Sequence, residues 1–181
     1  MRKIIAFIAL ALSFGSQVLA NDDTANREWE KSQTVGMVSM HGAYRNTQYG
    51  FSIPVIVAKM YRPAPPNPNH GMLAILGNQR EISVSGEFDA AEYGSTKSAL
   101  DHSLENEHAD SIKRESITLA GRPAEQATLR VGTTITKVVE QRRDEHGGII
   151  YELTLTTTQE HQAEDSALFD RILQSFKTTP L

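Results

Sequence analysis

Three side chains in the middle of the chain have types and a spacing that suit a divalent metal ion. Asp101, Glu105 and His108 stand at i, i+4 and i+7, which places them on one face if the segment is helical. Two carboxylates and an imidazole are ligands that divalent cations take in proteins. The competing interpretation is a solvated acidic helix face, since no fourth ligand can be identified in the sequence.

The sequence does not indicate a catalytic nucleophile. Ser52 lies in Gly50-Phe-Ser-Ile-Pro54, which lacks the second glycine of the Gly-x-Ser-x-Gly elbow of hydrolases. Cysteine is absent from the chain, which excludes a thiol nucleophile, disulfides and thiolate metal sites. No glycine-rich loop of the phosphate-binding kind is present. We therefore predict a protein that is not an enzyme and needs no cofactor.

A proline-rich segment is the second candidate for function. It connects Pro54 to Gly71, and proline fixes φ and removes a backbone donor, so the segment should be extended and cannot be a central strand. A stiff segment loses little entropy on binding, so it is a candidate contact surface for a protein partner. The alternative is a structural connection across the sheet edge. The candidate contact residues are Tyr61, Arg62, Pro65, Pro66 and His70.

The elements that must position these residues follow from hydrophobic periodicity. Alternation and turn signals predict strands, and two amphipathic segments predict helices. The strands are predicted at Val35–Met40, Tyr49–Ile53, Met72–Leu76, Arg80–Phe88, Ser116–Leu119, Ala124–Val131, Thr133–Arg142 and Ile149–Thr157. The helices are predicted at Ser95–His108 and at Ala163–Lys177, the latter with the stripe Leu168, Phe169, Ile172, Leu173 and Phe176. This order predicts an α+β fold, an antiparallel sheet with helices packed on it.

The beginning of the chain predicts export. Arg2 and Lys3 precede an apolar run that is too short to span a membrane, and Val18-Leu19-Ala20 supplies a small-residue cleavage site. We expect a signal peptide over 1–20, a polar lead-in over 21–34 and a single domain over 35–181. The predicted location is the periplasm, with no membrane insertion after cleavage.

Charge indicates the kind of partner. The chain has 181 residues with 18 basic and 22 acidic side chains, a formal charge of −4. Loss of Arg2 and Lys3 with the signal leaves 16 basic residues against 22 acidic ones, a charge of −6. An acidic protein does not neutralise phosphates, which argues against nucleic acid as a partner. It favours a basic protein partner through electrostatic steering.

Three local sequences are distinctive. They are Tyr49-Gly-Phe-Ser-Ile-Pro54, the hairpin Ile117-Thr-Leu-Ala-Gly-Arg-Pro-Ala124, and the ending in which Tyr151-Glu-Leu-Thr-Leu155 precedes Leu168-Phe-Asp-Arg-Ile-Leu-Gln-Ser-Phe176. These sequences resemble the PsbP/Mog1-like superfamily. The segment after Pro54 departs from this pattern, because it lacks the tryptophan of a Pro-x-x-Trp sequence and offers only Tyr61.

The resemblance implies a compact α/β/α sandwich and a mostly non-enzymatic group. Its members include photosystem assembly proteins, a nuclear-transport factor and secretion chaperones, and some immunity proteins against type VI secretion toxins have a similar fold. We therefore expect an exported protein that binds another protein, as an immunity protein against a periplasm-acting toxin or as an envelope assembly factor. The alternative is a periplasmic protein that binds a small ligand or a divalent metal. The oligomeric state is left open.

Overall fold

The computed structural model describes residues 42–64, 69–88, 90–144 and 148–180. The predicted signal peptide, the polar lead-in and the predicted strand Val35–Met40 lie outside these residues. Among the described residues, no helix is long and apolar enough to cross a membrane.

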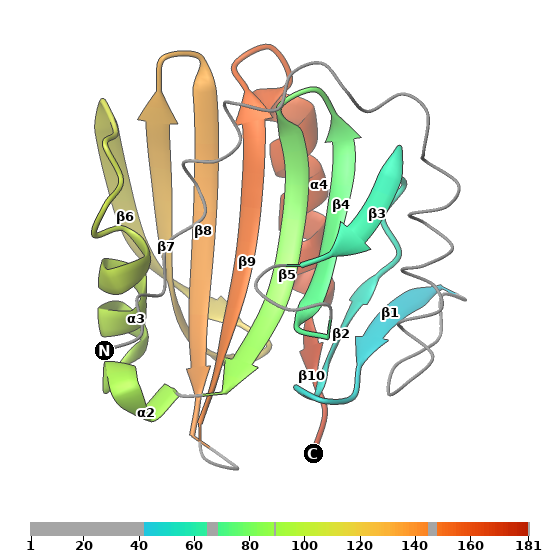
Figure 1. Cartoon of the computed structure of the whole chain (residues 1–181), viewed down its shortest axis with the longest axis vertical. Helices are drawn as coiled ribbons and strands as arrows, with labels where there is room; N and C mark the ends of the chain where they lie inside the picture. The colour runs from blue at the N-terminus through green and yellow to red at the C-terminus, as the bar shows by residue number, and fades with distance from the viewer. Residues whose placement is uncertain (1–41, 65–68, 89, 145–147, 181) are drawn as a thin grey trace.

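The centre of the fold is one large antiparallel sheet of seven strands (Figure 1). The strands follow one another across the sheet in the order β3, β4, β5, β9, β8, β7, β6, so the last hairpins fold back beside the earlier strands. Their bounds are β3 Met60–Pro63, β4 Gly71–Gly77, β5 Arg80–Phe88, β6 Ser111–Leu119, β7 Arg122–Val131, β8 Thr134–Arg143 and β9 Ile149–Thr158.

A second, three-stranded sheet is formed by segments from the two ends of the described chain. Strand β2 lies between β1 and β10, and both pair with it antiparallel. The bounds are β1 Ala43–Asn46, β2 Phe51–Pro54 and β10 Lys177–Thr178. Strand β10 directly follows the last helix, so this small sheet fixes the C-terminal end of the chain to the first described strands.

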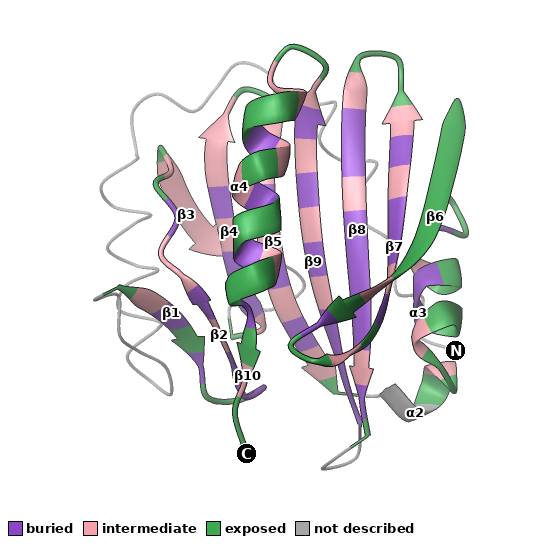
Figure 2. Ribbon diagram, turned by 180° about the vertical axis from the view of Figure 1, so that it is seen from behind, coloured by how far each residue is buried: buried purple, intermediate pink, exposed green. Residues whose placement is uncertain are grey.

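The helices lie on opposite faces of the large sheet. The long helix α4 (Gln162–Ser175) packs on β9 and β2, and α3 (Thr96–Ser103), which follows the short α2 (Ala90–Tyr93), packs on β8 and β7. Figures 1 and 2, which view the molecule from opposite sides, each show one of these helices in front of the sheet. We call the two faces the α4 side and the α3 side. The predicted α+β fold is confirmed.

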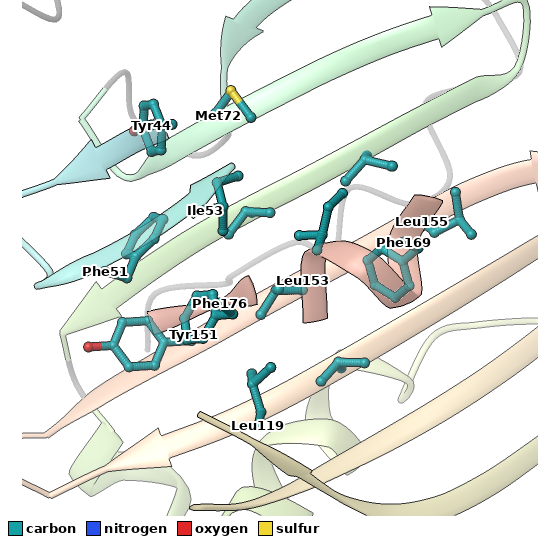
Figure 3. Packing of buried hydrophobic residues seen from close by; sticks show 14 of the residues in the cluster. Tyr44, Phe51, Ile53, Met72, Leu119, Tyr151, Leu153, Leu155, Phe169 and Phe176 are labelled. Carbon is teal, nitrogen blue, oxygen red and sulfur yellow. The ribbon is translucent and has the colours of Figure 1, made fainter. Parts of the chain in front are cut away.

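The main hydrophobic core fills the α4 side. The inward residues of β4, β5, β8 and β9 meet the apolar stripe of α4 and the side chains of the small sheet (Figure 3). Phe51, Tyr151 and Phe176 form an aromatic group, with ring centroids 5.4 to 5.8 Å apart. Phe169 is fully buried above Leu153 and Leu155 in the same cluster. The predicted stripe of α4 therefore does what its spacing indicates.

An ion pair also fastens α4 to the sheet. Arg80, at the start of β5, donates from Nε and Nη2 to the two carboxylate oxygens of Asp165, over 2.8 and 2.6 Å. Thr157 on β9 donates its hydroxyl to the same carboxylate. Burial alone would raise the pKa of Asp165, but these hydrogen bonds outweigh it and lower the pKa.

Helix α3, which was predicted at Ser95–His108, is shorter than its sequence pattern predicts. Ser95 caps it, since its Oγ accepts a hydrogen bond from the Ser98 amide, but the helix ends at Ser103. Leu100 and Leu104 pack on Ala127, Leu129 and Val138 in a separate, smaller core. The chain then turns and enters β6 at Ser111, five residues before the predicted start of that strand.

Three short strands were not predicted, namely β1, β3 and β10, and β10 begins at Lys177, where the second predicted helix ends. Strand β1 has only four residues, which gives no clear alternation by which to predict it. Strand β3 contains Pro63 and lies at the edge of the large sheet, which agrees with the expectation that the proline segment is extended and not central. The other strands occupy the predicted segments within a few residues.

Candidate functional site

Part of the α3 side is left without a helix among the described residues. Helix α3 lies over β7 and β8, and no described helix lies in front of β9, β5 or β4 in Figure 1. The uncovered side chains of β5 and β9 are nearly all acids or alcohols, and all of them are half-buried. We call this surface the polar face. Its residues are Glu81, Ser83, Ser85 and Glu87 of β5 and Glu152, Thr154 and Thr156 of β9.

The register of β5 and β9 assembles the polar face. Glu81 is paired with Thr156, Ser83 with Thr154 and Ser85 with Glu152. Paired residues of antiparallel strands point to the same face, so these side chains form cross-strand rows of hydrogen-bonding groups. Their neighbours in sequence, such as Ile82 and Val84, point to the α4 side and are fully buried. The alternation of apolar and polar residues along β5 and β9 thus places the apolar side chains in the core and the polar side chains on the polar face.

The polar face continues onto the edge of the sheet with one acid and one base. Burial raises the pKa of Glu81, and the positive charge of Arg62 on β3 partly offsets this effect. Arg62 also donates from Nε to the sulfur of Met60, 3.2 Å away. Leu73 and Ile75 of β4 lie between these two strands and are half-buried.

A pair of glutamates lies where the polar face meets α3. Glu140 on β8 is the register partner of Glu152 on β9, and Ser103 of α3 donates its hydroxyl to Glu140 Oε1 over 2.7 Å. Glu140 is only 1% exposed. Burial raises the pKa of both glutamates, that of Glu140 strongly, and the nearby negative charges of Glu152 and Glu87 raise it further. Both effects disfavour a negative charge on the two carboxyl groups at the same time.

This arrangement is suited to binding and offers no set of groups for covalent chemistry. Hydroxyls and carboxylates in rows accept hydrogen bonds and attract cationic groups. Among the described residues, no three His, Asp or Glu side chains are grouped so that they could hold a metal ion. A hollow of about 430 Å³ beside the start of α4 is lined by Lys137, Gln159, Glu160, Gln162, Ala163 and Ser166. Its lining consists of surface side chains and contains no nucleophile paired with a base.

The structure separates the predicted contact residues of the proline segment. Tyr61 packs against the main core on the α4 side, whereas Arg62, its neighbour in β3, lies on the α3 side beside Glu81. Pro65 and Pro66 lie outside the described residues. His70 immediately precedes β4 and contacts Tyr49. Among the described members of the set, Arg62 is therefore the one that lies beside the polar face.

His70 belongs to a structural network that holds the end of the proline segment. Its Nε2 lies 3.0 Å from the Tyr49 hydroxyl, and Asn46 donates from Nδ2 to the carbonyl of Asn69 over 3.0 Å. The Tyr49 ring packs against Gly86, where an added Cβ would lie 2.6 Å from the tyrosine Cβ. Burial lowers the pKa of His70 although a backbone group of Gly86 acts in the opposite direction, which favours neutral imidazole.

The three predicted metal ligands do not share a helix face. Asp101 is on α3 and forms an ion pair with Arg114 of β6. Glu105 lies beyond the end of the helix, 3.5 Å from Nδ1 of His102, and His108 is an exposed residue further along the connection. The predicted i, i+7 relation requires a helix through residue 108, and α3 ends at Ser103. The geometric premise of the metal site is therefore wrong.

Comparison with solved structures shows which known proteins have a similar fold. The chain is similar to cyanobacterial PsbP (CyanoP) from Synechocystis sp. PCC 6803, with a TM-score of 0.52 and 13% identity over 80% of this chain and 99% of that one. It is also similar to LpqN of Mycobacterium tuberculosis, a protein involved in cell envelope biogenesis, with a TM-score of 0.52 and 14% identity over 76% of this chain and 90% of that one. The chain has the PsbP/Mog1-like fold. The predicted family resemblance is confirmed for the fold.

Sequence comparison does not add to this result. No protein-family profile matches the chain, and no curated protein matches its sequence. The Ran-binding protein Mog1p of Saccharomyces cerevisiae also matches in structure, with a TM-score of 0.49 and 9% identity over 75% of this chain and 94% of that one. At such low identity the likeness concerns the fold, so functional residues must be argued from this chain itself.

Sequence reasoning missed the polar face although one of its signals was visible. The alternation of Arg80–Phe88 predicted the buried residues of this strand, and no prediction was drawn from the polar half of the same pattern. Two neighbouring central strands with one acidic and hydroxylated face are the signal. The pairing of β5 with β9, more than 60 residues further along the chain, is what brings the two halves together, and no local pattern specifies it.

Proposed function

We propose that this protein is an exported, non-enzymatic binding protein that uses its polar face to hold another protein. The observation that carries the proposal is the row of acids and alcohols on β5 and β9, two inner strands of the large sheet in front of which no described helix lies. A sheet face that only needed to be soluble would not require carboxyl groups whose pKa values are raised by burial. Perturbed acids on a half-buried surface support a binding role.

The charges of the polar face support a basic partner. Glu81, Glu87 and Glu152 lie on it, and Arg62 is a base at its edge. The chain carries more acidic than basic residues overall, 22 against 18. Charge complementarity of this kind raises the association rate and discriminates against acidic partners.

The role that we propose is envelope assembly or maintenance, with immunity against a periplasm-acting toxin as the competing role. LpqN, which has a similar fold, is involved in cell envelope biogenesis, and this favours the first role. Both roles require export and binding to a protein, and neither requires catalysis. They differ in the partner, which is an envelope component in one case and a toxin in the other.

Capture with two matched arginine variants tests the binding face. Ser83→Arg places a cation in the centre of the polar face, and Gln174→Arg places the same side chain on the exposed side of α4. From a periplasmic extract, the wild type and Gln174→Arg should retain the same basic protein, and Ser83→Arg should lose it while keeping the wild-type melting temperature. Equal retention by both folded variants would overturn the proposal, and an acidic captured protein would overturn the basic partner.

A further inference from the structure

The glutamate pair at the border of the polar face has a polar atom that the fold leaves without a donor. Glu140 accepts from Ser103 through Oε1, whereas its Oε2 is buried and has no hydrogen-bond donor among the described residues. The group beside it is the carboxyl of Glu152, an acceptor of the same kind. Two such oxygens can be adjacent only if a proton or another positive group lies between them.

We propose that the Glu140–Glu152 pair receives a cationic side chain of the protein partner, a lysine ammonium or an arginine guanidinium, in exchange for the proton that the two carboxyl groups share. This inference rests on the proposed function and adds the recognised group to it. The carboxyl group of Glu140 is buried beneath α3, whereas the carboxyl group of Glu152 is half-buried and faces the polar face. The entering cation therefore arrives from the side on which the partner lies.

The surroundings of the pair make a cation the favoured ligand. Glu87 on β5 adds a third negative charge. Lys97 of α3 is exposed to solvent, and the following charged groups on the elements that pack there have partners of their own. Glu125 of β7 accepts from Ser116, Arg142 of β8 pairs with Asp144, and on α3 and after it Asp101 pairs with Arg114 and His102 with Glu105.

The exchange has a defined proton balance. In the free protein one proton is held between the carboxyl groups, and on binding it leaves to solvent while the ammonium or guanidinium donates hydrogen bonds to the two carboxylates. Because binding releases a proton, affinity must increase with pH, by at most about tenfold per pH unit below the pKa of the pair. Salt should weaken the interaction less than it weakens a fully exposed pair, because Glu140 is buried.

Calorimetric titration with a hexa-lysine peptide tests the exchange. The protein is titrated between about pH 5 and pH 8 in two buffers that differ in ionisation enthalpy, so that the heat difference counts the protons. We expect release of up to about one proton per peptide at the acidic end, declining as pH rises. Glu152→Gln should abolish the release and weaken binding about tenfold. Glu140→Gln serves as a second variant with the same expectation.

The matched control is Glu125→Gln, which removes one negative charge from the next strand on the same side of the sheet. Glu125 is half-buried, is the register partner of Glu140 and accepts hydrogen bonds from Ser116. Its replacement should keep the proton release and an affinity within about twofold of the wild type. Absence of peptide binding, binding without proton release, or equal losses in Glu152→Gln and Glu125→Gln would each overturn the inference. The proposed function fails separately, when Ser83→Arg retains the partner.

Discussion

The two sides of the large sheet are built from the same strands and differ in what covers them. On the α4 side, fourteen helical residues and a second sheet cover an apolar and aromatic core. On the α3 side, a helix of eight residues covers mainly β7 and β8 and reaches β9 at Ile150, and the rest of β5 and β9 carries acids and alcohols. The α4 side therefore accounts for most of the folding free energy, and the α3 side holds the groups available for a partner.

The largest expected effect is a loss of stability from a substitution on the α4 side. Phe169→Ala removes a fully buried ring from α4 and should lower the free energy of unfolding by about 3 to 5 kcal/mol in a urea titration. On the polar face, Ser83→Ala should change it by about 0.5 kcal/mol or less. Equal losses of unfolding free energy at the two positions would contradict the claim that the α4 side supplies most of the stability.

The next effect concerns the ion pair that fastens α4. Arg80→Met leaves the buried carboxylate of Asp165 without its partner and should lower stability by about 3 to 5 kcal/mol. Because the pKa of Asp165 is lowered in the folded state, its contribution is present above the unfolded pKa and is lost as pH falls. Arg80→Met should therefore flatten the acid limb of the stability profile, whereas Glu164→Gln, which changes an exposed acid near Arg80, should leave it unchanged.

The glutamate pair predicts the opposite pH dependence on the α3 side. The pKa of Glu140 is raised in the folded state, so its contribution to stability is present below the unfolded pKa and is lost as pH rises toward the folded pKa. Each unit of that rise corresponds to about 1.4 kcal/mol. Glu140→Gln mimics the protonated acid, so thermal unfolding at neutral pH should occur at a higher temperature than in the wild type. A lower temperature, with Glu125→Gln unchanged, would contradict the shared proton.

The smallest expected effect lies at the predicted metal ligands. Asp101→Ala combined with Glu105→Ala removes two partly exposed ion pairs and should change stability by about 1 kcal/mol or less. Calorimetric titration of the wild type with calcium and with zinc should give no binding heat. Heat that disappears in the double variant would restore the metal hypothesis and assign the α3 side a different ligand.

The sequence predicted the α4 side better than the α3 side for a physical reason. Burial imposes strict periodicity, so the stripe through Phe169 and Ile172 and the alternation through Ile82 and Val84 could be recognised directly. The polar face needs the pairing of β5 with β9, which depends on the whole sheet. Each of its residues is common on protein surfaces, and only their position side by side across two strands indicates a binding surface.

The local geometry that the two site predictions assumed differs from the structure at points where tertiary structure overrides local pattern. The metal hypothesis required a helix through residue 108, and the chain instead leaves α3 to enter the edge strand β6. The contact hypothesis treated Tyr61 and Arg62 as one surface, and strand geometry sends them to opposite sides of the sheet. Both hypotheses assumed a continuous element in a segment that changes conformation, and the binding roles of these residues stay predictions.

Site-specific photocrosslinking tests the central claim most directly. A benzoylphenylalanine replaces Thr154 on the polar face in one variant and Gln174 on the exposed side of α4 in another, and both are irradiated in intact cells. The account predicts a crosslink from position 154 to a basic protein of the envelope or to a toxin, and none to that protein from position 174. A partner that crosslinks at position 174 and not at position 154 would contradict the account.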